Sequence, residues 1–155
     1  MPDALPPDHP HGARQRWMAV LARAHAAEIA DRLAACGELP KYQRLRGPEA
    51  GLVMVRGRAG GGGRAFNLGE MTVTRCSVQT DGGFVGHAYV TGRDERQAEL
   101  AALVDALLQN PQRKAPLLTS IIEPLAAAQQ ARRAAVTAKA AATRVEFFAM
   151  RNMRT

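Results

Sequence analysis

Residues 71–90, M-T-V-T-R-C-S-V-Q-T-D-G-G-F-V-G-H-A-Y-V, decide the fold. Both ends of this stretch are rich in β-branched residues, which are typical of strands. Asp81-Gly82-Gly83 lies between them and favours the positive φ angles of a tight hairpin. The stretch therefore predicts two antiparallel strands, over residues 71–78 and 84–90.

Strand and helix patterns extend from this hairpin toward the N-terminus. L-V-M-V at 52–55 is a third strand candidate, and residues 42–46 form a weaker fourth. Before them, apolar residues recur at i, i+3 and i+4 spacing from about Arg14 and fade at Cys36. This periodicity predicts two short helices with a break near His25.

Toward the C-terminus the pattern becomes helical again. Asp94 is placed as the N-cap of a helix, and Gln97 stands three residues later in capping-box position. Apolar residues then follow one face until Pro111, which ends the predicted helix. A last helix is expected to begin at Pro116 or Pro124 and to extend to about residue 150.

Taken together, these elements predict an α+β fold. We expect a small antiparallel sheet of three to four strands, N-terminal helices, a following helix and a long C-terminal helix. Residues 1–12 are rich in proline and histidine and are expected to be disordered, and residues 13–123 form the α+β domain. Residues 124–155 form a basic, alanine-rich helix that we expect to dock on another subunit.

The charge of the chain indicates an anionic partner. Its formal net charge is +7, and the segment from residue 126 to residue 155 contains six basic residues but only one acidic residue. Such a basic segment usually meets nucleic acid, an anionic surface or an acidic protein. The N-terminus has no apolar leader and no stretch approaches 18 apolar residues, so we expect a cytoplasmic protein that does not enter a membrane.

A run of four glycines, in V-R-G-R-A-G-G-G-G-R at 55–64, raises the question of phosphate binding. Glycine-rich backbone and guanidinium groups both suit phosphate oxygens. The run lacks the lysine and hydroxyl of a nucleotide loop, however, and a further strand follows it instead of a helix. We therefore expect a flexible hairpin loop, and Arg56, Arg58 and Arg64 stay as candidates for an anion contact.

No set of residues predicts catalysis or metal binding. His87 is expected to be a hydrogen-bonded packing residue on a strand, and Cys36 and Cys76 lack metal-ligand spacing. Glu99 and Asp105 lie six residues apart, on different faces of one helix. We accordingly assign no catalytic, cofactor-binding or metal-binding residue. This absence favours a binding or assembly subunit.

The end of the last helix is the candidate interface with a partner. The helix body is mostly alanine, which forms helices well but buries little surface. Phe147, Phe148 and Met150 follow together at its end, close to Arg144. This aromatic end suits docking on another subunit, although packing on its own domain is an equal alternative.

The order and spacing of several short motifs resemble the PhnG family, the G subunit of the bacterial carbon–phosphorus lyase core complex. The resemblance extends over essentially everything after residue 13. The motifs that carry it are R-Q-R-W-M-A-V-L-A (14–22), E-A-G-L-V (49–53), G-G-G-G-R-A-F-N-L-G (60–69), T-V-T-R (72–75), V-T-G-R-D (90–94), A-E-L-A-A-L-V-D-A-L (98–107), I-I-E-P-L (121–125) and T-R-V-E-F-F-A-M (143–150).

This resemblance implies a subunit of α-D-ribose 1-methylphosphonate 5-triphosphate synthase, with the H, I and J subunits as partners and the L subunit as accessory. The complex transfers the ribose triphosphate moiety of MgATP to a phosphonate and releases adenine. MgATP is then a substrate of the complex, and no cofactor is expected on this chain, which should be inactive alone. The alternatives are a free-standing basic nucleic-acid-binding protein and an independent phosphonate- or anion-binding module.

Overall fold

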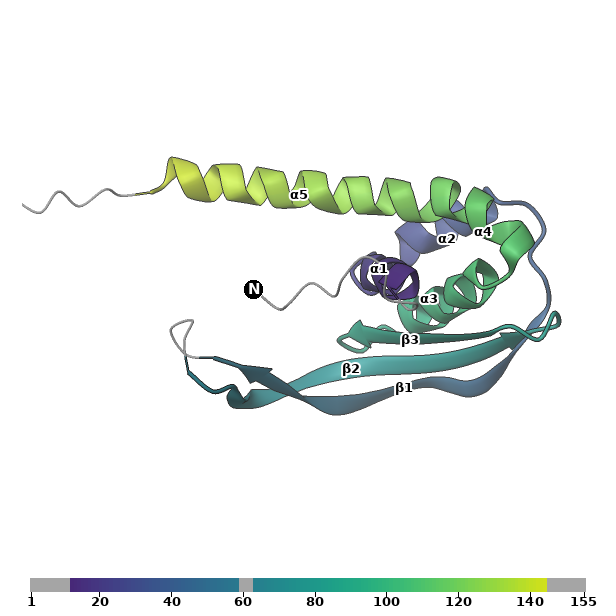
Figure 1. Cartoon of the computed structure of the whole chain (residues 1–155), viewed down its shortest axis with the longest axis horizontal. Coiled ribbons are helices and arrows are strands. Elements are labelled where there is room, and N and C mark those ends of the chain that lie inside the picture. The colour runs from purple at the N-terminus through teal and green to yellow at the C-terminus, as the bar shows by residue number, and fades with distance from the viewer. Residues whose placement is uncertain (1–11, 59–62, 145–155) are drawn as a thin grey trace, which may run out of the picture.

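The computed structural model describes residues 12–58 and 63–144. A three-stranded antiparallel sheet has the order β1-β2-β3, and the helices lie over one of its faces (Figure 1). The predicted α+β fold is confirmed. None of the helices in the described ranges is long and apolar enough to cross a membrane.

The sheet has three strands because two predicted strands join into one. β1 extends over Tyr42–Gly57, β2 over Phe66–Thr80 and β3 over Val85–Thr91. The weaker candidate at 42–46 and the candidate at 52–55 are therefore parts of the same strand. Shifts of register between Arg44 and Glu49 accommodate the intervening Gly-Pro pair, because a bulge tolerates a residue without an N–H donor.

The predicted hairpin between β2 and β3 is confirmed. Gly83 has a φ of +81°, the left-handed conformation that the tight turn requires. The two strands pair only from Val73 opposite Thr91 to Gln79 opposite Val85. β1 and β2 pair much further, as far as Gly57 opposite Phe66. Half of the β1–β2 hairpin therefore extends past the end of β3.

Two short helices precede the sheet, as predicted. α1 extends over Gly12–Leu21 and α2 over Ala26–Ala34, with His25 as the N-cap residue of α2. α3 follows the sheet over Glu95–Leu108, and the side chain of Asp94 accepts a hydrogen bond from the Gln97 amide at 2.8 Å, so the predicted N-cap is confirmed. The Gln97 side chain instead donates to carbonyl groups at the end of α1 and in the turn after it, including that of Ala24 at 2.7 Å.

Of the two predicted starts of the last helix, the one at Pro124 is confirmed and the one at Pro116 is wrong, because a separate short helix precedes it. α4 begins at Pro111 and ends at Leu117, so Pro116 lies inside it. Proline suits the first position of a helix, where its missing N–H has no partner to lose. A π-helical turn, Leu118–Ile122, then leads into α5, which extends over Glu123–Ala142. The predicted end near residue 150 was wrong, because α5 ends at Ala142 with Thr143 as its C-cap residue.

α3 packs directly on the sheet and fills the core. Gly86 of β3 permits this close approach, since a Cβ atom added there would lie 1.9 Å from the carbonyl oxygen of Ala102. Side chains from the N-terminal helices, from β2 and from the helices after the sheet complete the core, among them Leu21, Ile29, Val78, Leu103 and Ile121. None of the described helices lies over the opposite face of the sheet (Figure 1).

Candidate subunit interface

The three candidate arginines lie at the outer end of the β1–β2 hairpin. Arg56 belongs to β1, whereas Arg58 and Arg64 lie beside the glycine loop, and all three are exposed. Arg56 makes a long hydrogen bond of 3.5 Å to the carbonyl oxygen of Ala65. Most of the glycine run lies outside the described residues. The structure thus brings these cations to one end of the molecule, and their contact with an anion stays a prediction.

The same end of the hairpin exposes large apolar side chains. We call residues 51–57 and 66–72 the ribbon end, because here β1 and β2 pair with each other beyond the end of β3. Five of the nine exposed large apolar residues in the described chain lie in it: Leu52 (63% exposed), Met54 (52%), Phe66 (49%), Leu68 (58%) and Met71 (38%). A group of this kind typically marks an interaction surface.

Apolar side chains lie on both faces of the ribbon end. Leu52 is paired with Thr72, and Val53 is paired with Met71. Because neighbouring residues of a strand point to opposite faces, Leu52 and Met54 share one face while Val53 and Met71 share the other. Gly57 accommodates Leu68, since a Cβ added at Gly57 would lie 2.5 Å from a methyl group of that leucine. The two strands of the ribbon end cannot bury the apolar side chains on either of its faces.

The second candidate surface is α5. Its buried residues are Leu125 and Gln129, and the amide of Gln129 donates to the carbonyl oxygen of Val20 at 2.8 Å. Residues 130–142, which we call the free half of α5, are all exposed. One ion pair, between Arg132 and Glu28 at 2.7 Å, ties the start of this half to α2.

The predicted interface residues at the end of α5 are only partly visible. Arg144 is exposed just beyond the end of the helix. Phe147, Phe148 and Met150 lie outside the described residues, so their role stays a prediction. The free half of α5 and the ribbon end both extend beyond the helical layer on the same side of the molecule (Figure 1).

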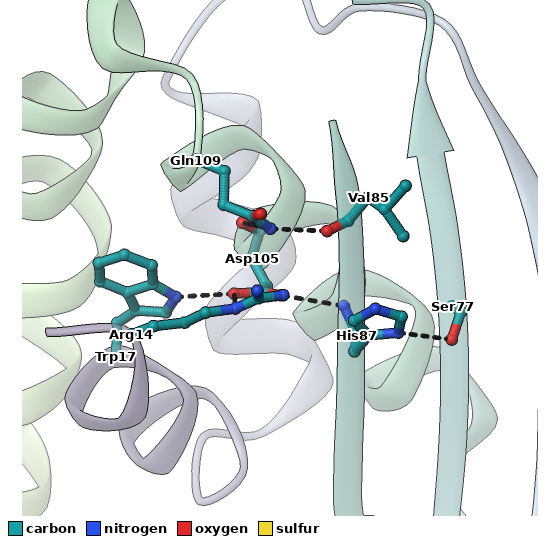
Figure 2. A network of polar contacts seen from close by, with 7 residues as sticks. All are labelled: Arg14, Trp17, Ser77, Val85, His87, Asp105 and Gln109. Atoms are coloured by element: carbon teal, nitrogen blue, oxygen red, sulfur yellow. Dashed lines mark hydrogen bonds and ion pairs between the residues drawn. The ribbon is translucent and has the colours of Figure 1, made fainter. Parts of the chain in front are cut away.

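In the interior of the domain, a buried carboxylate joins the sheet to helices α1 and α3 (Figure 2). Asp105 of α3 is fully buried and accepts two hydrogen bonds from the Arg14 guanidinium, at 2.7 and 3.2 Å. The indole N–H of Trp17 donates to it at 2.8 Å, and the backbone N–H of His87 donates at 2.9 Å. These four donors surround the carboxylate, so its geometry suits a structural role.

Ser77, His87 and Asp105 lie in a row but do not form a catalytic triad (Figure 2). The His87 ring is 2.8 Å from the Ser77 hydroxyl, through Nδ1. Asp105 binds the backbone of His87 and not its ring, so it cannot orient the imidazole as a triad carboxylate does. The expected hydrogen bond of His87 is thus present, but its expected packing role was wrong, because its side of β3 belongs to the uncovered sheet face and is exposed.

Comparison with known proteins decides the family. The family model of the phosphonate metabolism protein PhnG matches residues 12–152. The chain belongs to the PhnG family. It is 44% identical over 137 residues to the alpha-D-ribose 1-methylphosphonate 5-triphosphate synthase subunit PhnG of Rhizobium meliloti (strain 1021), a match that covers 88% of this chain and 87% of that protein. The resemblance found in the sequence motifs is confirmed.

Within this PhnG family chain, the acidic side chain of Glu99 also has structural partners. Glu99 accepts from the Arg44 guanidinium and the Tyr42 hydroxyl, and the pairing with Arg44 lowers the pKa of Glu99. Burial raises the pKa of the Cys76 thiol, which keeps this free cysteine protonated. Among residues 12–58 and 63–144, no three potential ligands cluster as a metal site would require.

A surface hollow of this PhnG family chain also lacks the charge of a phosphate site. The hollow has a volume of about 650 Å³ and lies beside the β2–β3 turn and the start of α4. Lys41 and Arg113 line it, but so do Glu38 and Asp81, so the opposite charges balance. In the described part of the chain, an excess of positive charge occurs together with exposed apolar side chains on the ribbon end and the free half of α5.

Sequence reasoning missed the apolar residues of the ribbon end. It identified the arginines there, but Leu52, Met54, Phe66 and Leu68 were attributed to strands of an ordinary sheet. The unequal strand lengths that create this surface are visible only in the structure, where β2 begins seven residues before its pairing with β3 does. The predicted strand at 71–78 concealed this difference.

Proposed function

We propose that this chain is a subunit of ribose 1-methylphosphonate 5-triphosphate synthase, within the carbon–phosphorus lyase core complex. It supports the transfer of the ribose triphosphate moiety of MgATP to a phosphonate, with release of adenine. The observation that carries this proposal is the 44% identity to the PhnG subunit of that synthase, along nearly nine-tenths of both chains.

The role of the chain in this reaction is supporting rather than catalytic. In the transfer, the bond between the ribose and adenine breaks and a phosphonate oxygen forms the new bond to the same carbon. The departing base needs a proton donor, and the developing charge on the ribose needs stabilisation. In the described part of the chain, the one fully buried carboxylate, Asp105, is already surrounded by donors, and His87 is bound to Ser77.

The partners in this proposal are the H, I and J subunits, with the L subunit as accessory. MgATP is a substrate of the assembly, no cofactor belongs to this chain, and the assembly works in the cytoplasm. The exposed apolar ribbon end and the free half of α5 support a subunit role, because each of these two surfaces is left exposed and a partner would cover it.

Co-expression with the H, I and J subunits tests this proposal. We expect the chain to co-purify with them at moderate salt, and the assembly to release adenine from MgATP in the presence of methylphosphonate, measured by chromatography. The assembly without this chain, and the isolated chain, should release none. Double substitution of Ser77 and His87 by alanine should leave the rate within about twofold. A chain that ignores these partners but binds nucleic acid tightly, in a strongly salt-dependent manner, would contradict the proposal.

A further inference from the structure

We propose that the ribbon end and the free half of α5 are two arms that hold one acidic partner subunit between them, with the ribbon end as the apolar anchor. This inference rests on the proposed function and specifies the surface through which the chain assembles. It also shifts the expected anchor from the end of α5, which the sequence favoured, to strands β1 and β2.

The apolar surface of the ribbon end is the first argument. Leu52 and Leu68 are 63% and 58% exposed, although burial of a leucine side chain normally lowers the free energy of the protein. A two-stranded hairpin without a third strand or a covering helix is marginally stable in water. A partner surface that covers these leucines would stabilise the pairing and bury the exposed area.

The charge of the two arms is the second argument. The ribbon end and its flanking residues carry three arginines and one glutamate, a formal charge of +2: Arg56, Arg58, Arg64 and Glu70. Residues 130–144 carry four basic residues and no acid, a charge of +4: Arg132, Arg133, Lys139 and Arg144. The rest of the described chain has twelve basic and ten acidic residues, only +2. The positive charge is therefore concentrated on the two arms, with the larger share on α5 and the apolar surface on the ribbon end.

This concentration selects the kind of partner. A second copy of the chain would bring two basic arms together, and like charges oppose such an interface. Nucleic acid would satisfy the charge but would leave the aliphatic anchors in contact with sugars and phosphates; single-strand binding usually relies on several stacked aromatic rings instead. A protein surface with an apolar pocket and an acidic rim satisfies both features.

The arrangement of the arms is the third argument. Both extend past the helical layer on the same side (Figure 1). The free half of α5 has a length of about 20 Å at 1.5 Å per residue, and the ribbon end has about the same length at 3.3 Å per residue. Two arms of equal reach on one side of the domain suit contact with a single body.

A competition experiment tests the anchor. Tagged wild-type chain and an untagged Leu52→Asp, Leu68→Asp variant are co-expressed with the H, I and J subunits, and their ratio in the purified assembly is measured. We expect at least a ~30-fold preference for wild type, as for the loss of a binding hot spot. Leu45→Asp is the matched control, because Leu45 is also on β1 and 53% exposed but lies outside the ribbon end. Thermal unfolding of each isolated variant verifies that it folds.

Photocrosslinking tests whether both arms contact one partner. Benzoylphenylalanine placed at Leu52 or at Val136 of the free half should capture the same subunit, and at Leu45 it should capture none. Equal incorporation of the Asp variant and wild type would overturn the inference, as would capture of two different subunits or of nucleic acid. Those results leave the proposed function standing, provided that the wild-type chain co-purifies; if it does not, the proposed function itself fails.

Discussion

The carboxylate of Asp105 receives donors from two elements that lie far apart in the sequence. Arg14 and Trp17 reach it from α1, and the backbone N–H of His87 reaches it from β3. A buried charge is costly unless its partners are complete, because the protein interior cannot replace the water that it loses. This one side chain therefore fixes how α1 and α3 sit on the sheet.

We predict that Asp105→Asn destabilises the fold by about 3 kcal/mol or more, in the range measured when one member of a buried ion pair is removed. An asparagine amide would place N–H groups against the donors that now surround the carboxylate. Trp17→Phe, which removes one donor and retains a ring, should cost about 1–2 kcal/mol. Denaturant unfolding followed by circular dichroism measures both. Equal losses for Asp105→Asn and for Glu99→Gln, whose ion pair with Arg44 is partly exposed, would contradict the prediction.

The sequence could not reveal this role of Asp105. It showed only that the residue lies on a different helical face from Glu99, which is correct: Glu99 pairs with Arg44 of β1. The partners of Asp105 are 88 and 91 residues away in α1, and one of its donors is a backbone group. Long-range contacts of this kind leave no local pattern of spacing or propensity.

At the scale of elements, α5 divides into two halves with different roles. The first half packs on the domain through Leu125 and Gln129, whereas the second half is exposed throughout. The alanine-rich composition correctly predicted that this segment is a helix and that it buries little surface, since alanine favours helix and has a small side chain. It could not locate the division, because Gln129 is buried through a hydrogen bond to α1 and not through hydrophobic periodicity.

Truncation at this division should separate folding from assembly. We expect deletion of residues 131–155 to change the melting temperature of the isolated chain by only a few degrees, because the removed residues that are described are exposed. The same deletion should lower incorporation into the synthase assembly. Deletion from residue 126 is the contrasting variant: it also removes Gln129 and should lower the melting temperature further. Full assembly of the shorter deletion would rule out α5 as an arm.

The link between α5 and α2 depends on pH. The hydrogen bond from Arg132, and next the one from the His25 backbone, lower the pKa of Glu28 from its ordinary value of 4.5. A carboxyl group with a lowered pKa in the folded state stabilises the fold above its ordinary pKa, and this contribution is lost as the pH falls through the lowered value. We expect the melting temperatures of wild type and Glu28→Gln to differ most near pH 7 and to converge below pH 4.5. In an Arg132→Gln background the dependence should flatten, and an unchanged curve would contradict this account.

At the scale of the whole molecule, the sheet and helices were predictable in type and order, while the arms were not. Hydrophobic periodicity and turn residues specify local structure, so the β2–β3 hairpin, the α1–α2 break and the α3 N-cap followed from sequence. Where the helical layer ends is a property of packing in three dimensions. The sequence pattern therefore identified strands, but it did not show that the leucines of the ribbon end lie beyond the helical layer and are exposed.

Exposed apolar anchors within a basic surface predict an unusual response of the isolated chain to salt. At low ionic strength the positive arms should keep two copies apart; near 1 M salt the Debye length falls to about 3 Å and that repulsion is largely screened. The apolar ribbon ends can then associate, because burial of their leucines stays favourable in salt. We expect light scattering to show a monomer at 50 mM NaCl and growing self-association toward 1 M. Leu52→Asp should suppress this association and Leu45→Asp should not. Association that weakens with salt would instead indicate contacts between opposite charges, and would remove the ribbon end as its cause.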